Sequence, residues 1–101
     1  MKMLKIKKPN TLIKKVFVRN GKYCAVGWLA RVIGVSDTTL SSTYFCTLAH
    51  TIINRLHTDY SVEISEDEIR ELLASNDLLE YSKDRIENFI RWCESKGITV
   101  D

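Results

Sequence analysis

A helical repeat of apolar side chains between Tyr44 and His57 constrains the fold more than any other feature of the sequence. Residues spaced three and four apart lie on one side of a helix, and the apolar residues of this segment follow that spacing. Asn54 and Arg55 fall on the opposite side. The apolar members of the repeat are Phe45, Cys46, Leu48, Ala49, Ile52, Ile53 and Leu56. The pattern predicts a central helix that buries one face.

Capping residues mark two further helices in the second half of the chain. Ser65-Glu66-Asp67-Glu68 is a capping box, in which the serine accepts from the amide of Glu68 and the glutamate reaches back. The last helix is predicted to begin at a Ser82 cap and to end at Gly97, with Ile98 in apolar contact beyond it. Its inward stripe is predicted to be Ile86, Phe89, Ile90 and Cys93.

Two shorter helices are expected before the central one. Residues 24–33 form an apolar segment that Gly34 is suited to end, and Ser36 with Asp37 can cap a helix running to Thr43. The segment before them is ambiguous. Residues 11–18 have helical apolar spacing, whereas Asn20-Gly21 between two apolar runs is a strong hairpin signal. The favoured interpretation is a short helix followed by a turn or small hairpin.

At 101 residues, the chain is long enough for one core. We therefore expect a single, compact, mainly α domain over residues 1–101. It would have about five helices, with a small N-terminal β-hairpin left open and residues 1–10 as a basic N-terminal arm.

Charge is divided unevenly along the chain. Residues 1–58 hold ten Lys and Arg against one acid, a net of +9, and residues 59–101 hold five against twelve, a net of −7. Eight of the basic residues precede Tyr23: Lys2, Lys5, Lys7, Lys8, Lys14, Lys15, Arg19 and Lys22. Such a cluster can meet phosphate, an acidic partner protein or the acidic half of the same chain.

Cysteine usage and hydropathy indicate the compartment. Three cysteines without C-x-x-C spacing are typical of free thiols in a reducing environment. The longest apolar run, residues 24–30, is far shorter than a membrane span, and lysines interrupt any N-terminal signal segment. The expectation is a cytoplasmic protein that does not contact a membrane.

Residues 29–41 resemble the helix-turn-helix of bacterial and phage repressors, with Gly34 at the turn and Val35 and Leu40 as apolar plugs. The resemblance would direct four hydroxyl side chains to bases and four lysines to phosphates. The residues are Ser36, Thr38, Thr39 and Ser42 for bases, and Lys7, Lys8, Lys14 and Lys15 for phosphates. Against this reading, the second helix contains Asp37 and no Arg or Lys.

A second resemblance covers about two thirds of the chain. Residues 21–30, Gly-Lys-Tyr-Cys-Ala-Val-Gly-Trp-Leu-Ala, together with Leu72-Leu73-Ala74-Ser75-Asn76-Asp77 and a last helix with Phe89-Ile90, are similar to small phage- and prophage-encoded proteins of uncharacterised function. The resemblance implies a bacteriophage context and an accessory role. Cys24 and Gly27 would then allow close helix packing, while Asn76 and Asp77 would close the turn between the last two helices and bond backbone near Gly27.

Catalytic and metal-binding hypotheses are weaker. Cys24 with His50 or His57 supplies the residue types of a thiol nucleophile, but apolar neighbours would raise the pKa of Cys24. Cys46 and His50 have the i, i+4 spacing of a metal pair, although a core cysteine beside boundary histidines explains them better. We expect no enzyme activity, no metal and no cofactor.

The resulting hypothesis is a phage accessory protein in the cytoplasm of an infected bacterium, which inhibits or redirects a host protein, with defence components among the candidates. The proposed contact residues are Glu66, Asp67, Glu71, Tyr81 and Trp92. The acidic half would imitate nucleic-acid charge toward a DNA-handling enzyme. A helix-turn-helix DNA-binding protein is the alternative, and the oligomeric state stays open.

Overall fold

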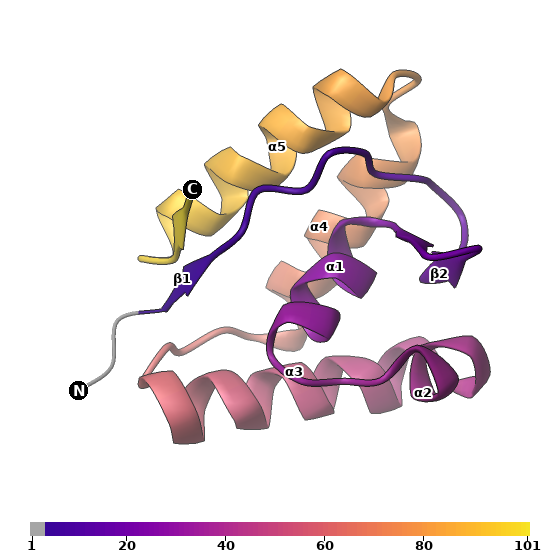
Figure 1. The fold of residues 1–101 in the computed structure, drawn as a ribbon. Coiled ribbons are helices and arrows are strands. Elements are labelled where there is room, and N and C mark those ends of the chain that lie inside the picture. The colour runs from indigo at the N-terminus through magenta and orange to yellow at the C-terminus, as the bar shows by residue number, and fades with distance from the viewer. Residues whose placement is uncertain (1–3) are drawn as a thin grey trace.

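Helices dominate the structure, a computed structural model that describes residues 4–101 (Figure 1). Within that range the helices are α1 Ala25–Val32, α2 Asp37–Ser42, α3 Phe45–Tyr60, α4 Glu66–Leu78 and α5 Ser82–Ser95. Two pairs of two-residue strands accompany them: β1 Lys5–Ile6 with β4 Thr99–Val100, and β2 Val18–Arg19 with β3 Lys22–Tyr23. The prediction of a mainly α fold with about five helices is confirmed.

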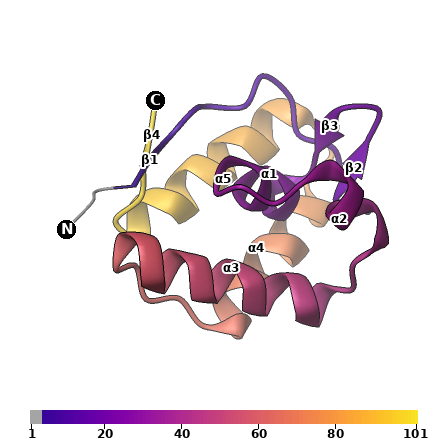
Figure 2. The same cartoon turned by 60° about the horizontal axis from the view of Figure 1, so that its bottom comes forward.

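α1 is the centre of the molecule. It contacts α3, α4 and α5, and those helices surround it in Figures 1 and 2. Ala25, Val26, Leu29 and Ala30 are completely buried. Gly27 faces the backbone of Phe17 so closely that a Cβ atom there would lie 2.1 Å from the Phe17 carbonyl oxygen. Small residues therefore let α1 pack directly against main chain.

The helix ends predicted at Gly34, Ser36, Ser65 and Gly97 are confirmed. α1 ends at Gly34, which has a φ of 103°, and the amide of Val35 donates to the Ala30 carbonyl at 3.0 Å. α5 ends in the same way at Gly97, which has a φ of 79°, and the amide of Ile98 donates to the Cys93 carbonyl at 2.9 Å. Both are Schellman motifs. Ser36 caps α2, and the capping box of Ser65 and Glu68 begins α4.

The central helix agrees with its repeat except at one edge. Leu48, Ala49, Ile52 and Leu56 are buried, as predicted. Cys46, which the repeat places on the buried arc, is exposed. It lies in the first turn of α3, and the buried residues of this helix begin only at Leu48.

α5 corrects two predictions. Ser82 does not cap the helix: Tyr81 occupies the N-cap position, and the Ser82 hydroxyl instead accepts from the amide of Leu12 at 2.9 Å. The buried face is rotated from the predicted stripe. Its residues are Arg85, Phe89, Trp92 and Cys93, while Ile86 and Ile90 are half-buried. The rotation follows from the polar contacts of Arg85 and Trp92 described below.

Residues 11–26 contain the hairpin and not the predicted helix. β2 and β3 pair antiparallel through Asn20-Gly21, whose φ values of 51° and 74° are those of a type I′ turn. The helix expected over residues 11–18 is absent. Residues 11–15 belong to what we call the strap, residues 7–15, which crosses the molecule from β1 toward the hairpin (Figure 1), and Val18 begins β2.

Side chains from α4 and α5 bind the backbone of the strap. Arg85 Nε donates to the Leu12 carbonyl at 2.7 Å, and Asn76 Nδ2 donates to the Ile13 carbonyl at 3.0 Å. Asp77 accepts from the amide of Lys15 at 2.9 Å. Helical hydrogen bonds are thereby replaced by contacts with residues more than sixty positions away. Because these partners are distant in sequence, the local apolar spacing wrongly predicts a helix over residues 11–18.

The expected basic N-terminal arm is, over residues 4–10, part of the fold. β1 and β4 pair parallel, and Thr99 and Asp101 donate to the carbonyls of Leu4 and Ile6 at 3.1 and 2.9 Å. Leu4, Ile6 and Pro9 are buried. The first three residues of the predicted arm, Lys2 among them, lie outside the described residues. Figure 2 shows β1 and β4 together at one end of the molecule.

Candidate functional site

The outer face of α4 carries exposed apolar side chains next to acids. Asp67, Glu71, Ala74 and Leu78 are exposed and recur at intervals of four, three and four residues, which places them on one side of the helix. Leu78 is 86% exposed, and Tyr81, three residues further on, is 68% exposed. We call these five residues the outer α4 surface. Large apolar side chains this open to solvent are candidates for contact with a partner.

The charge of the outer α4 surface comes from Asp67 and Glu71. Neither carboxylate forms an ion pair within residues 4–101. Glu66 differs from them, because its carboxylate contacts His50 and Arg70, each at 2.9 Å. These hydrogen bonds lower the pKa of Glu66. Glu66 thus joins α4 to α3, and the structure does not group it with Asp67 and Glu71.

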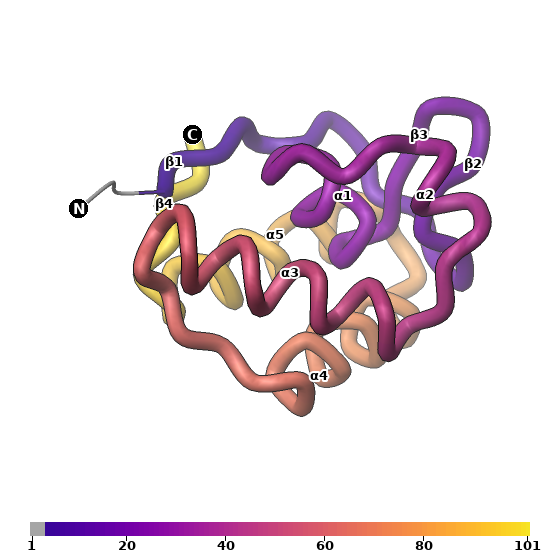
Figure 3. The backbone as a smooth tube through the Cα atoms, turned by 90° about the horizontal axis from the view of Figure 1, so that it is seen from below, coloured from indigo at the N-terminus to yellow at the C-terminus, as the bar shows by residue number. Residues whose placement is uncertain are grey.

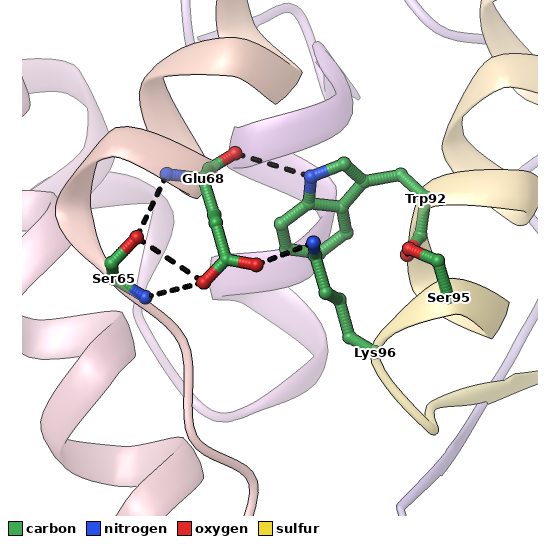
Figure 4. A network of polar contacts seen from close by, with 5 residues as sticks. All are labelled: Ser65, Glu68, Trp92, Ser95 and Lys96. Carbon is green, nitrogen blue, oxygen red and sulfur yellow. Dashed lines mark hydrogen bonds and ion pairs between the residues drawn. The ribbon is translucent and has the colours of Figure 1, made fainter.

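Trp92 is not available to a partner, contrary to prediction. Its side chain is buried between α4 and α5, where Nε1 donates to the Glu68 carbonyl at 3.1 Å (Figure 4). The Lys96 ammonium group lies 5.6 Å from the centre of the indole ring and pairs with the Glu68 carboxylate. That pairing lowers the pKa of Glu68. Trp92 is therefore part of the α4–α5 contact.

Sequence reasoning missed Leu78. The residue lies nine positions beyond buried Ile69, and nine steps of about 100° place it on the opposite side of the helix. A helical projection of residues 66–78 would have separated Leu78 from the core. Leu78 was overlooked because it lies in the last turn of the helix, next to Leu79, where the predicted helix boundary is uncertain by a residue or two.

The helix-turn-helix segment has the expected apolar plugs. Val35 and Leu40 are buried, but α2 packs against β2 rather than closely against α1, which departs from the expected helix-turn-helix packing. Ser36, Thr38, Thr39 and Ser42 are exposed.

Most of the α2 hydroxyls are already bonded. Ser36 donates to Thr39, Ser41 donates to the Asp37 carbonyl, and Ser42 donates to the Thr38 carbonyl. Asp37 accepts from the Tyr23 hydroxyl at 2.7 Å and lies 3.4 Å from Arg31. A base edge would have to compete with these contacts.

The lysines predicted to hold phosphate are distributed along the strap. Lys7, Lys8 and Lys15 are exposed and form no ion pair within residues 4–101. Lys14 lies 3.9 Å from Glu80, so part of its charge meets the acidic half of the chain. The free cations follow one extended segment and are not gathered in a pocket.

Of the thiols, Cys24 and Cys93 are buried, whereas exposed Cys46 lines a shallow hollow with His50. Burial raises the pKa of the Cys24 thiol to about 11 and that of Cys93 to about 12. His50 contacts Glu66, and His57 contacts Glu63. Residues 4–101 hold no cluster of three potential metal ligands.

Asn76 and Asp77 bond backbone groups, but not to close the turn between α4 and α5. Asn76 is completely buried, and its Oδ1 accepts from the amide of Ala25 at 3.3 Å while its Nδ2 reaches the strap. The turn is closed by main chain, since the amide of Leu79 donates to the Asn76 carbonyl. Cys24 Sγ accepts from the amide of Gly27 and caps α1. These residues therefore join α1, α4 and the strap.

Within residues 4–101, no helix is long and apolar enough to cross a membrane. Comparison of the chain with known protein families, with curated proteins and with solved structures finds no match.

Proposed function

We propose that this chain is a bacteriophage-encoded accessory protein that binds a host protein in the cytoplasm of the infected bacterium and inhibits or redirects it. The phage context rests on the motifs of residues 21–30 and 72–77. The binding role rests on the outer α4 surface, and components of host defence are the targets we favour.

The exposure of Leu78 beside unpaired carboxylates carries the proposal. A side chain of this size at 86% exposure, with Tyr81 close in sequence, offers apolar area that a partner would cover. Asp67 and Glu71 on the same face attract a basic partner surface. A DNA-handling enzyme has such a surface, and the carboxylates would take the place of phosphates.

The test is capture from a nuclease-treated bacterial lysate, read by mass spectrometry. The tagged protein is compared with Leu78→Ser and Asp67→Lys/Glu71→Lys variants. We expect a stoichiometric protein partner that each variant loses by roughly tenfold or more, since central anchors dominate such interfaces. Tyr44→Ser and Glu94→Lys are the matched controls, because both residues are exposed on other elements. A partner retained by all variants would refute this binding surface.

DNA binding is the second candidate, favoured by Lys7, Lys8 and Lys15, which form no ion pair within residues 4–101. In this case duplex DNA would shift in a gel at low salt, and affinity would fall steeply as salt rises. Replacing Lys7, Lys8, Lys14 and Lys15 by Gln would reduce the salt slope by about one for each phosphate that the variant no longer neutralises. The absence of a shift at low salt would eliminate this function.

A further inference from the structure

A groove separate from the outer α4 surface opens beside the β2–β3 hairpin. It has a volume of about 360 Å³ and lies between residues 15–18, the end of α2 and the inner edge of α4. Figure 3 shows the hairpin at one end of the molecule with α2 next to it. Val16, Val18, Leu40 and Leu73 give the groove an apolar lining.

The main chain of this segment presents an unpaired strand edge. Phe17 accepts from Cys24 across the hairpin, and Val18 is opposite Tyr23. In an antiparallel pair with a two-residue turn, hydrogen-bonded and non-hydrogen-bonded pairs alternate. The N–H and C=O groups of Val18, and by the same alternation those of Val16, therefore point away from β3. Neither residue has a backbone or side-chain partner for these groups within residues 4–101.

The opposite edge of the hairpin is already covered. The carbonyl of Tyr23, which points away from β2, accepts from the amide of Ile13 in the strap at 2.9 Å. One edge is thus occupied by an extended segment of the same chain. The other edge, at Val16 and Val18, has the same hydrogen-bonding capacity and borders the groove.

Lys15 fixes where this edge begins. Its φ is 74°, an unfavourable conformation for a residue with a side chain, and its amide is held by Asp77 at 2.9 Å. This bend separates the strap from the edge. Backbone strain that the surrounding structure maintains, as at Lys15, is often found at binding sites.

The charge around the edge is positive. Lys15 lines the groove, and Arg19 and Lys22 follow in the hairpin; all three are exposed and form no ion pair within residues 4–101. Asp77 is the acid in the lining, and its Oδ1 already accepts from Lys15 and Asn76. An occupant with carboxylates would complement this charge.

We propose that this groove binds an extended segment of a partner protein, which pairs with the outer edge of β2 as an additional strand. Backbone hydrogen bonds to Val16 and Val18 would supply its register. Apolar side chains of the segment would fill the groove, and acidic side chains would meet Lys15, Arg19 and Lys22. The site is independent of the outer α4 surface.

The experiment begins with selection from a displayed library of random peptides of about ten residues, the length of one strand. We expect enriched peptides with alternating apolar residues and acidic flanks. In NMR-detected hydrogen exchange, a selected synthetic peptide should slow the amides of Val16 and Val18, which have no hydrogen-bond partner within residues 4–101, and leave the already bonded Arg19 unchanged. Failure to enrich any peptide, or binding that leaves both amides fast, would overturn the proposal.

N-methylation of the peptide tests strand pairing without altering the protein. Methyl groups on alternate amides should weaken binding by roughly tenfold, and methyl groups on the intervening amides should have little effect, because only one set faces β2. Equal effects at both sets would refute pairing.

Protein variants complete the test. Val18→Pro removes the outward donor but not a β2–β3 hydrogen bond and should lose the peptide, whereas Val18→Thr should retain it. Lys15→Gln should weaken binding about threefold, while Arg91→Gln on α5 should not change it. Leu78→Ser should bind the peptide normally, which separates this site from the proposed function. A dimer in sedimentation that Val18→Pro abolishes would identify a second copy as the occupant and overturn the proposal.

Discussion

At the scale of single residues, the three cysteines should differ sharply in reactivity. Cys24 and Cys93 are buried, with pKa values raised to about 11 and about 12, so almost no thiolate exists at neutral pH. Cys46 is exposed. Iodoacetamide should therefore modify Cys46 alone in the native protein and all three thiols in denaturant, as read by intact mass and peptide mapping. Rapid native modification of Cys24 would revive the catalytic hypothesis.

Gly27 should not tolerate even a methyl group. Alanine normally stabilises a helix interior by about 1 kcal/mol relative to glycine. At Gly27 the added Cβ would lie 2.1 Å from the Phe17 carbonyl oxygen, which forces main chain to move. Gly27→Ala is expected to lower the free energy of unfolding by about 2 kcal/mol, measured by urea denaturation.

Gly21→Asn is the control for Gly27→Ala. Gly21 has a positive φ that asparagine adopts readily and no atom within 4 Å of its Cβ position. The free energy of unfolding of the Gly21→Asn variant should stay within about 0.5 kcal/mol of the parent value. A neutral Gly27→Ala would show that main chain at Phe17 can withdraw from α1 at little cost.

At the scale of elements, the strap should depend on Asn76. Asn76→Ala would leave the buried Ala25 amide and the part-buried Ile13 carbonyl without this partner, at a cost of about 2–4 kcal/mol. Asn88→Ala is the control, because Asn88 makes one part-buried hydrogen bond to Ser75 and should cost about 1 kcal/mol. Amide exchange in residues 11–15 should accelerate in the Asn76 variant only. Equal losses of stability in the two variants would contradict the role of Asn76.

The contact between α4 and α5 should weaken in acid. Lys96 and the Ser65 amide hold the pKa of Glu68 below its ordinary value in the folded protein. A lowered folded pKa adds stability that is present above the ordinary glutamate range, near pH 4.3, and is lost as pH falls through the lowered value. Glu68→Gln should flatten the acid side of the stability profile while retaining the capping box.

Glu71→Gln is the comparison for Glu68→Gln, since Glu71 has no ion pair within residues 4–101. Its urea midpoint should follow the parent profile between about pH 3 and 6, the range around the ordinary carboxyl pKa. An unchanged profile for the Glu68 variant would show that this carboxylate does not couple to folding.

The sequence predicts the elements that carry their own signals. The capping box at Ser65 and the glycines at 34 and 97 specify helix ends through local geometry, and all three were predicted correctly. The strap could not be predicted, because its hydrogen bonds come from Asn76, Ser82 and Arg85. Long-range contacts of Arg85 with Leu12 and of Trp92 with Glu68 accompany the rotated buried face of α5. Helical spacing places Asp67 and Glu71 together, and the same projection of residues 66–78 sets Leu78 on their side of the helix, opposite Ile69.

At the scale of the whole molecule, the two oppositely charged parts of the chain meet through exposed ion pairs. Lys5 lies 3.9 Å from Asp101, and Lys14 lies 3.9 Å from Glu80. Exposed pairs of this kind contribute about 0–1 kcal/mol each and are screened by salt. Raising the salt concentration from about 0.05 M to about 1 M should therefore lower the free energy of unfolding by less than about 2 kcal/mol. A larger loss, measured by urea denaturation, would mean that charge attraction is a main source of stability.

The pairing of β1 with β4 has a consequence for synthesis on the ribosome. Leu4 and Ile6 are held by Thr99 and Asp101, and the strap is held by α4 and α5. A chain that emerges from its N-terminus exposes residues 4–15 before any of these partners has been made. The contacts of this basic, partly apolar segment with Thr99 and Asp101 can form only after residue 101 has left the exit tunnel.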